Sequence, residues 1–254
     1  MGPGPLSRPA REKARLMSLG IVAAMAAEAR ILVKGKVTPG ALIHLPEGAM
    51  MVLSGIGTRR ARSAARTLTE KGATGLVSWG VAGALLSAFS PGALILSETI
   101  IAADGSVYHA DPTWHERLCG KLKGHVALDK GSLAESAAVL SRAEKETLYR
   151  RTGAVAVDME SASIALVAEE ARIPFVAIRS ITDTVEMDIP RILLSSTDEF
   201  GRVQLSRLLF GILRRPPELL ALVRLGLAFR AAKATLAAVA LHAGENFAYG
   251  TATK

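Results

Sequence analysis

The feature that most constrains the fold is a strand, a helix and a second strand that follow one another directly. Residues 155–157 form a short apolar run that predicts the first strand. After it Ile164, Val167 and Ala171 recur at helical spacing, and Pro174 then ends the helix. The β-branched run 175–182 predicts a second strand that ends at Asp183. A strand, a helix and a strand in succession predict an α/β sheet.

The amino-terminal part repeats this alternation of strand and helix. Apolar runs at 19–24 and 49–55 predict strands, and each is followed by a segment of helical character, at 25–32 and 58–71. Two more strands are predicted in 75–80 and 93–103, separated by a loop that contains Gly and Pro. The region 105–151 is harder to place, apart from one helix predicted near its end. The alternation supports an α/β fold.

Length and composition narrow the class of protein. With 254 residues we predict one domain over 18–254, preceded by a disordered leader over 1–17 and ending in a helical extension over 202–254. Cys119 is the one cysteine, so no intramolecular disulfide forms and a reducing compartment is expected. With neither a secretory signal nor a bilayer-spanning apolar run in the sequence, we predict a cytoplasmic protein.

Several ligands are disfavoured. The net charge of +8 suggests a polyanionic partner, but the chain has no nucleic-acid-binding motif, so nucleic acid is not predicted. His109, Asp111 and His115 match no metal-site spacing, so no metal is predicted. Gly55 and Gly57 lack the third glycine of a dinucleotide fingerprint. We therefore expect no cofactor.

Three acids follow predicted strands, where ligands of open α/β sheets bind. They are Glu28, Glu160 and Asp183. Taken singly, each is also typical of a helix amino terminus or a solvated loop. Taken together, they match the tasks of breaking a sugar–base bond, which requires protonation of the base, binding of the ribose hydroxyls and activation of a nucleophile.

Several motifs resemble the purine nucleoside phosphorylase and methylthioadenosine/S-adenosylhomocysteine nucleosidase superfamily. These are "GIVAAMAAEARIL", "SGIGTRRARSAA", "GVAGALLSAFSPGALILSE" and "AVAVDMESASIALVAEEARIPFVAIRSITDT", in order over 19–184. The resemblance implies a three-layer nucleoside-phosphorylase-like fold, with a mixed central β-sheet flanked by helices and extra carboxy-terminal amphipathic helices. It also implies a homo-oligomer.

The resemblance also implies roles for individual residues. Glu28 would activate water and Asp183 would protonate the purine N7, with Thr182 beside it. Glu160 would bind the ribose 2′ and 3′ hydroxyls, with Met159 against the sugar. We interpret Asp158 as a helix cap.

The sequence departs from the family at two points. Val81 stands in place of the family's serine, next to Gly80, and we retain both as substrate-binding positions. The residue that stacks on the base has no clear counterpart here.

Water is favoured over phosphate as the nucleophile. The arginines that hold phosphate in phosphorolytic relatives are not evident, although Arg59, Arg60 and Arg179 remain candidates for an anion. A phosphorolytic enzyme, a methylthioadenosine/S-adenosylhomocysteine nucleosidase and a non-catalytic nucleoside- or lipid-binding protein stay open as alternatives.

The carboxy-terminal part is rich in Leu and Arg, and "RRPPE" divides it into two predicted helices. A basic amphipathic helix is able to lie at a membrane surface, and core or oligomer packing is the alternative. The whole pattern most resembles the hopanoid-associated branch, which implies adenosylhopane as substrate, adenine as product and a role in hopanoid biosynthesis. The resemblance therefore implies a lipid-linked nucleoside as the bound molecule and a peripheral contact with the membrane surface.

Overall fold

The sheet is organised around one long strand, β4 (Gly75–Ala84), in the computed structural model, which describes residues 17–189, 198–201 and 218–250. Strand β11 (Phe175–Asp183) runs parallel along one side of β4. On the other side β1 (Leu19–Ala23) pairs with residues 75–79, and β10 (Ala156–Asp158) pairs with Gly83 and Ala84. Residues 80–82 therefore have no strand partner on that side.

The remaining strands extend this framework into a mixed sheet. Beyond β1 the order continues to β3 and β2, beyond β10 to β9, β6 and β7, and beyond β11 to β5 and β8. These strands are β2 (Leu42–His44), β3 (Met50–Leu53), β5 (Leu94–Ser97), β6 (Thr99–Ile101), β7 (Val107–His109), β8 (Leu128–Asp129) and β9 (Leu133–Glu135).

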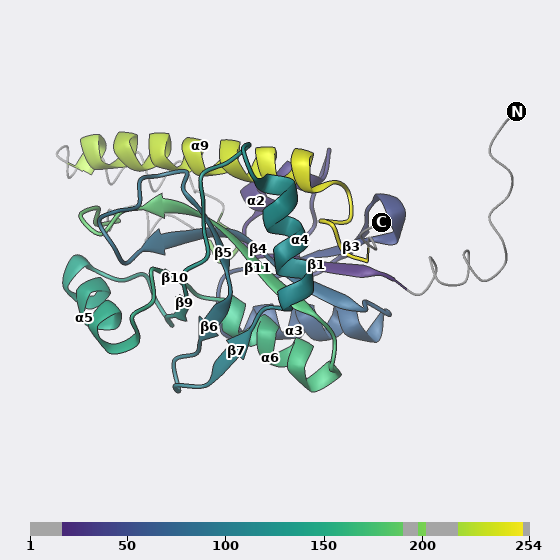
Figure 1. The fold of residues 1–254 in the computed structure, drawn as a ribbon. Helices are drawn as coiled ribbons and strands as arrows, with labels where there is room; N and C mark the ends of the chain where they lie inside the picture. Colours follow the sequence, from purple (N-terminus) through teal and green to yellow (C-terminus); the bar gives the residue numbers. More distant parts are fainter. Residues whose placement is uncertain (1–16, 190–197, 202–217, 251–254) are drawn as a thin grey trace, which may run out of the picture.

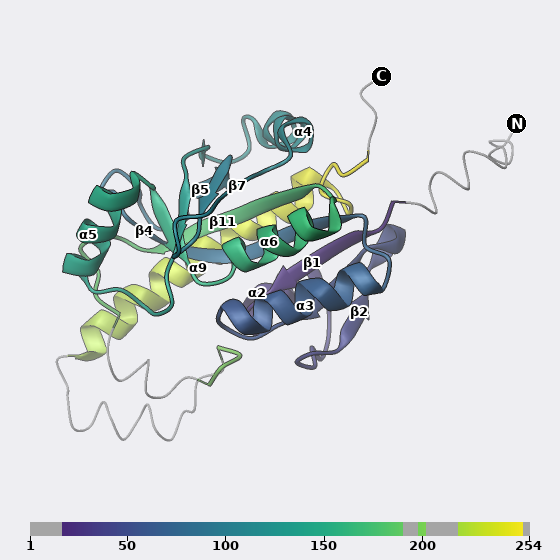
Figure 2. The same ribbon diagram turned by 90° about the horizontal axis from the view of Figure 1, so that it is seen from below.

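Helices cover both faces of the sheet (Figures 1 and 2). On one face α3 (Thr58–Glu70) packs against α6 (Ser161–Ala171). On the other α9 (Glu218–Ala243) contacts α2 (Ala26–Leu32) and α4 (Pro112–Leu122). Helix α5 (Arg142–Thr152) lies beside the part of the sheet that contains β9 and β10 (Figure 1). A short 3₁₀ turn, η1 (Pro46–Gly48), precedes β3.

The alternation of side chains along the strands builds a core on each face. Ile21, Val77 and Trp79 belong to the core beneath α9, whereas Val22 and Leu76 belong to the core beneath α3 and α6. Two helical layers on a mixed sheet form the three-layer α/β fold that the motifs predict.

The segment after α9 is anchored in the core. The indole ring of Trp79 lies edge-on to Phe247, with ring centroids 5.2 Å apart. Trp114 Nε1 donates a hydrogen bond to the carbonyl of Phe247, and the Tyr249 hydroxyl donates to the carbonyl of Thr74. The end of the described chain is thus part of the folded domain. Within the described ranges, no helix combines the length and the hydropathy needed to cross a membrane.

Most of the predicted elements are confirmed, but the single strand predicted for 93–103 is wrong, because the chain breaks at Glu98 into β5, which pairs with β11, and β6, which pairs with β7 and β9. Two boundaries also differ. The strand predicted for 75–80 continues to Ala84 because β11 pairs along it, and the strand before Met159 ends at Asp158 rather than at Val157. The region 105–151 holds β7, α4, β8, β9 and α5. The leader lies almost wholly outside the described residues, as does the first carboxy-terminal helix. The second carboxy-terminal helix is α9.

Candidate active site

The three predicted acids lie just past or at the carboxyl ends of β1, β10 and β11. Glu28 is in the first turn of α2, Glu160 is the residue before α6, and Asp183 is the last residue of β11. All three side chains are buried. The order of strands therefore brings residues from distant parts of the sequence to one region of the sheet, as open α/β sheets do at their ligand sites.

Glu28 is fixed by three backbone N–H groups. Its Oε2 accepts hydrogen bonds from Ala24 and Met25, 3.1 and 2.8 Å away, and its Oε1 accepts from Val81 at 3.0 Å. Val81 belongs to the part of β4 that lacks a strand partner on this side, so the carboxylate takes the place of that partner. Burial raises the pKa of Glu28, and the nearby guanidinium of Arg179 and these N–H groups partly oppose the rise.

Gly80 makes this approach sterically feasible. A Cβ at that position would collide with Glu28 Oε1 and would lie 2.6 Å from Arg179 Nη1. The neighbouring Trp79 is buried and donates its indole N–H to the carbonyl of Glu28 over 3.2 Å. Trp79 therefore supports the backbone of Glu28.

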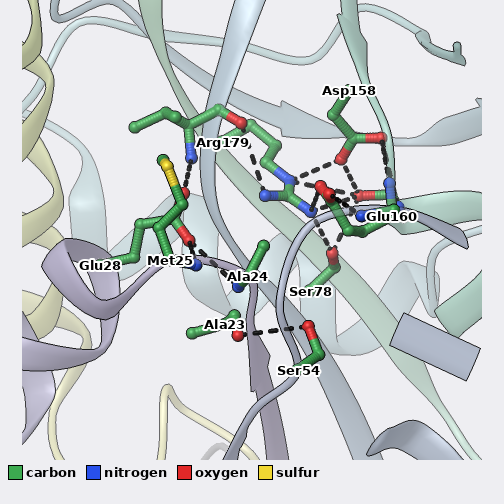
Figure 3. A network of polar contacts seen from close by, with 12 residues as sticks. Ala23, Ala24, Met25, Glu28, Ser54, Ser78, Asp158, Glu160 and Arg179 are labelled. Atoms are coloured by element: carbon green, nitrogen blue, oxygen red, sulfur yellow. Dashed lines mark hydrogen bonds and ion pairs between the residues drawn. The ribbon is translucent and has the colours of Figure 1, made fainter. Parts of the chain in front are cut away.

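Arg179 lies at the centre of the acid cluster (Figure 3). Its Nε is 2.7 Å from Asp158 Oδ2, and its Nη2 is 3.8 Å from Glu160 Oε2. Nη2 also donates to the hydroxyls of Ser78 and Ser161, at 2.6 and 3.1 Å. One buried guanidinium is thus the counter-charge of three carboxylates: it contacts Asp158 and Glu160, and it acts electrostatically on Glu28.

Glu160 is held at the turn between β3 and α3. Its Oε1 accepts a 2.9 Å hydrogen bond from the backbone of Gly57, whose φ of 103° suits glycine. Burial and the neighbouring Asp158 raise the pKa of Glu160 to about 7, although Arg179 acts in the opposite direction. Glu160 therefore changes charge near neutral pH.

Asp158 binds the start of α6 as predicted, but it lies two residues before the N-cap position, which Glu160 occupies. Its Oδ1 accepts from the backbone N–H groups of Glu160 and Ser161, where α6 begins, and its Oδ2 accepts from the Ser161 hydroxyl. Both oxygens are thereby occupied with the helix start and with Arg179.

Asp183 occupies a separate place further along β4. An irregularity in β11 after Ile181 sets Asp183 opposite Gly83, where a Cβ would lie 2.7 Å from Asp183 Oδ2. Oδ1 accepts a 2.9 Å hydrogen bond from Thr182, and Oδ2 accepts one of 2.5 Å from Lys145 of α5. Gly80 and Gly83 are three residues apart, which is about 10 Å along an extended strand.

The structure places the predicted residues in two groups beside β4, although they come from different helices and strands. Glu28, Glu160, Gly80 and Val81 gather around Arg179, and Thr182 contacts Asp183. Met159 is half-buried between the two acids of "DME". Sequence reasoning missed Lys145, because a lysine in "AEKETLYRR" looks like an ordinary solvated helix residue. It considered Arg179 only as an anion ligand or a strand-end ion pair, and the latter is closer to what is found.

The remaining candidates have structural contacts. Arg60 pairs with Glu199, and Arg59 is exposed on α3. Asp111 caps α4 by accepting from the N–H of Trp114 at 2.7 Å, and buried His115 bonds the carbonyl of Leu96. Across the part of the chain that the structure describes, no three His, Cys, Asp or Glu side chains gather as metal ligands would.

Comparison with solved structures places the fold in a recognised class. The 5′-methylthioadenosine/S-adenosylhomocysteine nucleosidase of Neisseria meningitidis in complex with methylthio-immucillin-A superposes with a TM-score of 0.65 at 19% identity, over 87% of this chain and 96% of that one. The native futalosine hydrolase of Helicobacter pylori gives 0.59 at 21% identity, over 66% and 88%. The fold is thus that of nucleosidases and nucleoside phosphorylases.

The sequence identifies the family. The profile of the phosphorylase superfamily matches residues 18–208, so the chain belongs to that superfamily. No curated protein matches the sequence.

Proposed function

We propose that this protein hydrolyses the N-glycosidic bond of an adenosyl compound and releases adenine. The observation that carries the proposal is the placement of three buried acids along β4, with Glu28 and Glu160 around Arg179 and Asp183 about 10 Å further on. A nucleoside has its reacting carbon between the ribose hydroxyls and the base. Two separated groups of acids match that arrangement.

Each acid has a role suited to its surroundings. Glu28, with a raised pKa, accepts a proton from water as the water attacks C1′. The C1′–N9 electron pair passes to the purine, whose N7 takes a proton from Asp183. The Glu160 carboxylate accepts hydrogen bonds from the 2′ and 3′ hydroxyls, with Met159 against the sugar.

The arginines support water rather than phosphate as the nucleophile. Arg179 is already bound to Asp158 and close to Glu160, and Arg60 is paired with Glu199. A phosphate ion at this site would face three buried carboxylates. The test is adenine release in buffers with and without phosphate. An absolute requirement for phosphate would replace hydrolysis by phosphorolysis.

We propose that the substrate is adenosylhopane and that the reaction belongs to hopanoid biosynthesis. We also propose that the protein is a cytoplasmic homo-oligomer that binds to the membrane surface. Support comes from α9, where exposed apolar side chains recur on one face: Leu219, Leu220, Val223, Leu227 and Leu241. Arg224, Arg230 and Lys233 give the helix three cations against the single acid Glu218. This charge suits an anionic lipid surface.

A lipid surface suits this face of α9 better than a second copy of the chain does. Arg230 is exposed near the middle of the helix, so a symmetric pairing would set it against its own counterpart. The test is co-sedimentation with vesicles that contain anionic phospholipid. Leu220→Ser with Leu227→Ser should reduce binding at least tenfold, whereas Val107→Ser, an exposed apolar position on β7, should not. Equal binding by both variants would refute the lipid contact.

The decisive experiment for the reaction is a panel of adenosylhopane, methylthioadenosine, S-adenosylhomocysteine and inosine, with free base as the readout. Release from adenosylhopane alone supports the hopanoid assignment, and preferential release from methylthioadenosine supports the small-nucleoside alternative. The non-catalytic alternative predicts binding without release, and unchanged affinity in Glu28→Gln and Asp183→Asn.

A further inference from the structure

Lys145 is a buried lysine that contacts the proposed leaving-group acid. Its side chain is 1% exposed, and its Nζ lies 2.5 Å from Asp183 Oδ2. It shares the inner face of α5 with buried Leu148. Lysine almost never reaches this degree of burial unless it is paired.

Helix α5 is fixed against the loop that follows Asp183. A capping box between Ser141 and Glu144 starts the helix, and the N–H of Arg142 donates to Asp188 at 3.2 Å. Lys145 Nζ also donates hydrogen bonds to the carbonyls of Thr184 and Met187, at 2.7 and 3.5 Å. Lys145 therefore joins α5, the end of β11 and the loop after it.

The contacts of Lys145 define its protonation state. Its three partners, Asp183 Oδ2 and the carbonyls of Thr184 and Met187, are all acceptors. A charged ammonium has three N–H donors for them, whereas a neutral amine would turn its lone pair toward an oxygen. The side chain is therefore an ammonium bound to a carboxylate.

This pairing creates a question for the proposed reaction. An ion-paired carboxylate carries no proton to give to a purine. Within the described residues, the groups bonded to the Asp183 oxygens are the Thr182 hydroxyl on Oδ1 and the Lys145 ammonium on Oδ2. Of these two, only the ammonium gives up a proton and becomes a stable neutral group.

We propose that Lys145 supplies the proton that Asp183 passes to the leaving base, which makes it a positioning residue that acts through Asp183. An Nζ–H bond breaks as Oδ2–H forms, and the proton moves to N7 as the C1′–N9 electrons enter the purine. Lys145 is then a neutral amine, and the proton that water gives up restores it through solvent. The proposal rests on the proposed function.

The test compares two leaving groups on the same sugar. One substrate is the adenosyl compound that the wild-type enzyme turns over fastest, and the other carries p-nitrophenolate in place of adenine, which departs without protonation. Lys145→Met should lower kcat for adenine release by about 100-fold or more, and for p-nitrophenolate release by less than about threefold. Equal loss on both substrates, or no loss of adenine release, would overturn the proposal.

Two further variants guard against a purely structural effect. In an Asp183→Asn background the buried carboxylate is gone, so adding Lys145→Met should change adenine release by less than about threefold. A structural lysine would cost the same factor in both backgrounds. Lys145→Arg keeps the charge, but a guanidinium does not give up a proton to become neutral in a protein, so near-wild-type adenine release by this variant would refute proton supply.

The matched control is Arg150→Met, which removes a cation from an exposed position of the same helix, paired with Glu146. It should leave release of both leaving groups unchanged. If the wild-type enzyme releases neither leaving group, the proposed function itself fails, and the role of Lys145 fails with it.

Discussion

The two ends of the proposed site balance charge in different ways. Around Arg179, one buried cation serves three carboxylates, whereas Asp183 has a buried cation of its own in Lys145. The first group carries an excess of negative charge when all its acids are ionised, and the second is neutral. Burial raises the pKa of Glu160 to about 7, and the neighbouring carboxylates of Asp158 and Glu28 add to the rise while Arg179 opposes it. One end is thus suited to accept a proton, and the other holds a proton in an ion pair.

The largest test of this contrast removes the shared cation. Arg179→Met leaves Asp158, Glu28 and Glu160 buried without a counter-charge, so the free energy of unfolding at pH 7.5 should fall by about 3–5 kcal/mol. Urea denaturation measures it. Arg179→Lys keeps the charge and should cost less, and equal losses in the two variants would show that charge is not what the acids require.

The proton-accepting end is tested by activity. Glu28→Gln places an amide N–H₂ group among the backbone N–H donors of Ala24, Met25 and Val81, and it removes the proposed base. Adenine release should fall by about 10³-fold. Initial rates at saturating substrate measure the change. Near-normal turnover would exclude Glu28 as the base.

The charge excess also predicts a dependence of stability on pH. A carboxyl whose pKa is raised in the folded protein, as in Glu160, binds its proton more tightly there than in the unfolded chain. Its stabilising contribution is full below pH 4.5 and is lost as pH rises through about 7, with a change on the order of 3 kcal/mol. Thermal melts from pH 5 to 8 should show this decline. Glu160→Gln should flatten it, and an unchanged slope would contradict the assignment.

Substrate binding should follow the same titration in the opposite direction. Ribose hydroxyls bind more strongly to the Glu160 carboxylate than to its neutral acid, so KM for the adenosyl substrate should fall between pH 6 and 8. Steady-state kinetics on Glu160→Gln supply the control, because that variant should show a KM that does not change in this range.

The smallest effect is expected at an exposed charge cluster. Glu170 pairs with Arg62 and Arg66, at 2.8 and 3.2 Å, and links α6 to α3. All three side chains are more than 40% exposed, so solvent screens the pairs and Glu170→Gln should leave the urea denaturation midpoint nearly unchanged. A loss comparable to that of Arg179→Met would show that burial does not explain the contrast.

Sequence patterns predicted the features of the fold and the site that depend on residues close together in the sequence. The strand–helix–strand unit ending at Asp183 and the helix after Gly57 were recognisable because periodicity and proline and glycine breaks are local signals. Glu28, Glu160 and Asp183 were recognisable because each follows a strand. The same reasoning placed Asp158 at the start of a helix, although Glu160 occupies the N-cap position.

The pairing of the buried acids with Arg179 and Lys145 could not be predicted from local sequence patterns. Lys145 lies 38 residues before Asp183 in the sequence, and nothing local marks it as buried. The length of β4 is set by its partner β11, and its bare stretch at 80–82 depends on where β1 ends and β10 begins. These features follow from the order of strands in the sheet, which a single sequence does not display.

Residues 80–82 of β4, which have no strand partner on the side of β1 and β10, offer a spectroscopic probe. The amide proton of Val81 is bonded to the carboxylate of Glu28 rather than to another strand. Its resonance in a ¹⁵N-edited spectrum should therefore shift as Glu28 gains or loses a proton, while the amides on either side remain in ordinary surroundings. One backbone signal would then report the charge of the proposed base, without substrate and without any substitution.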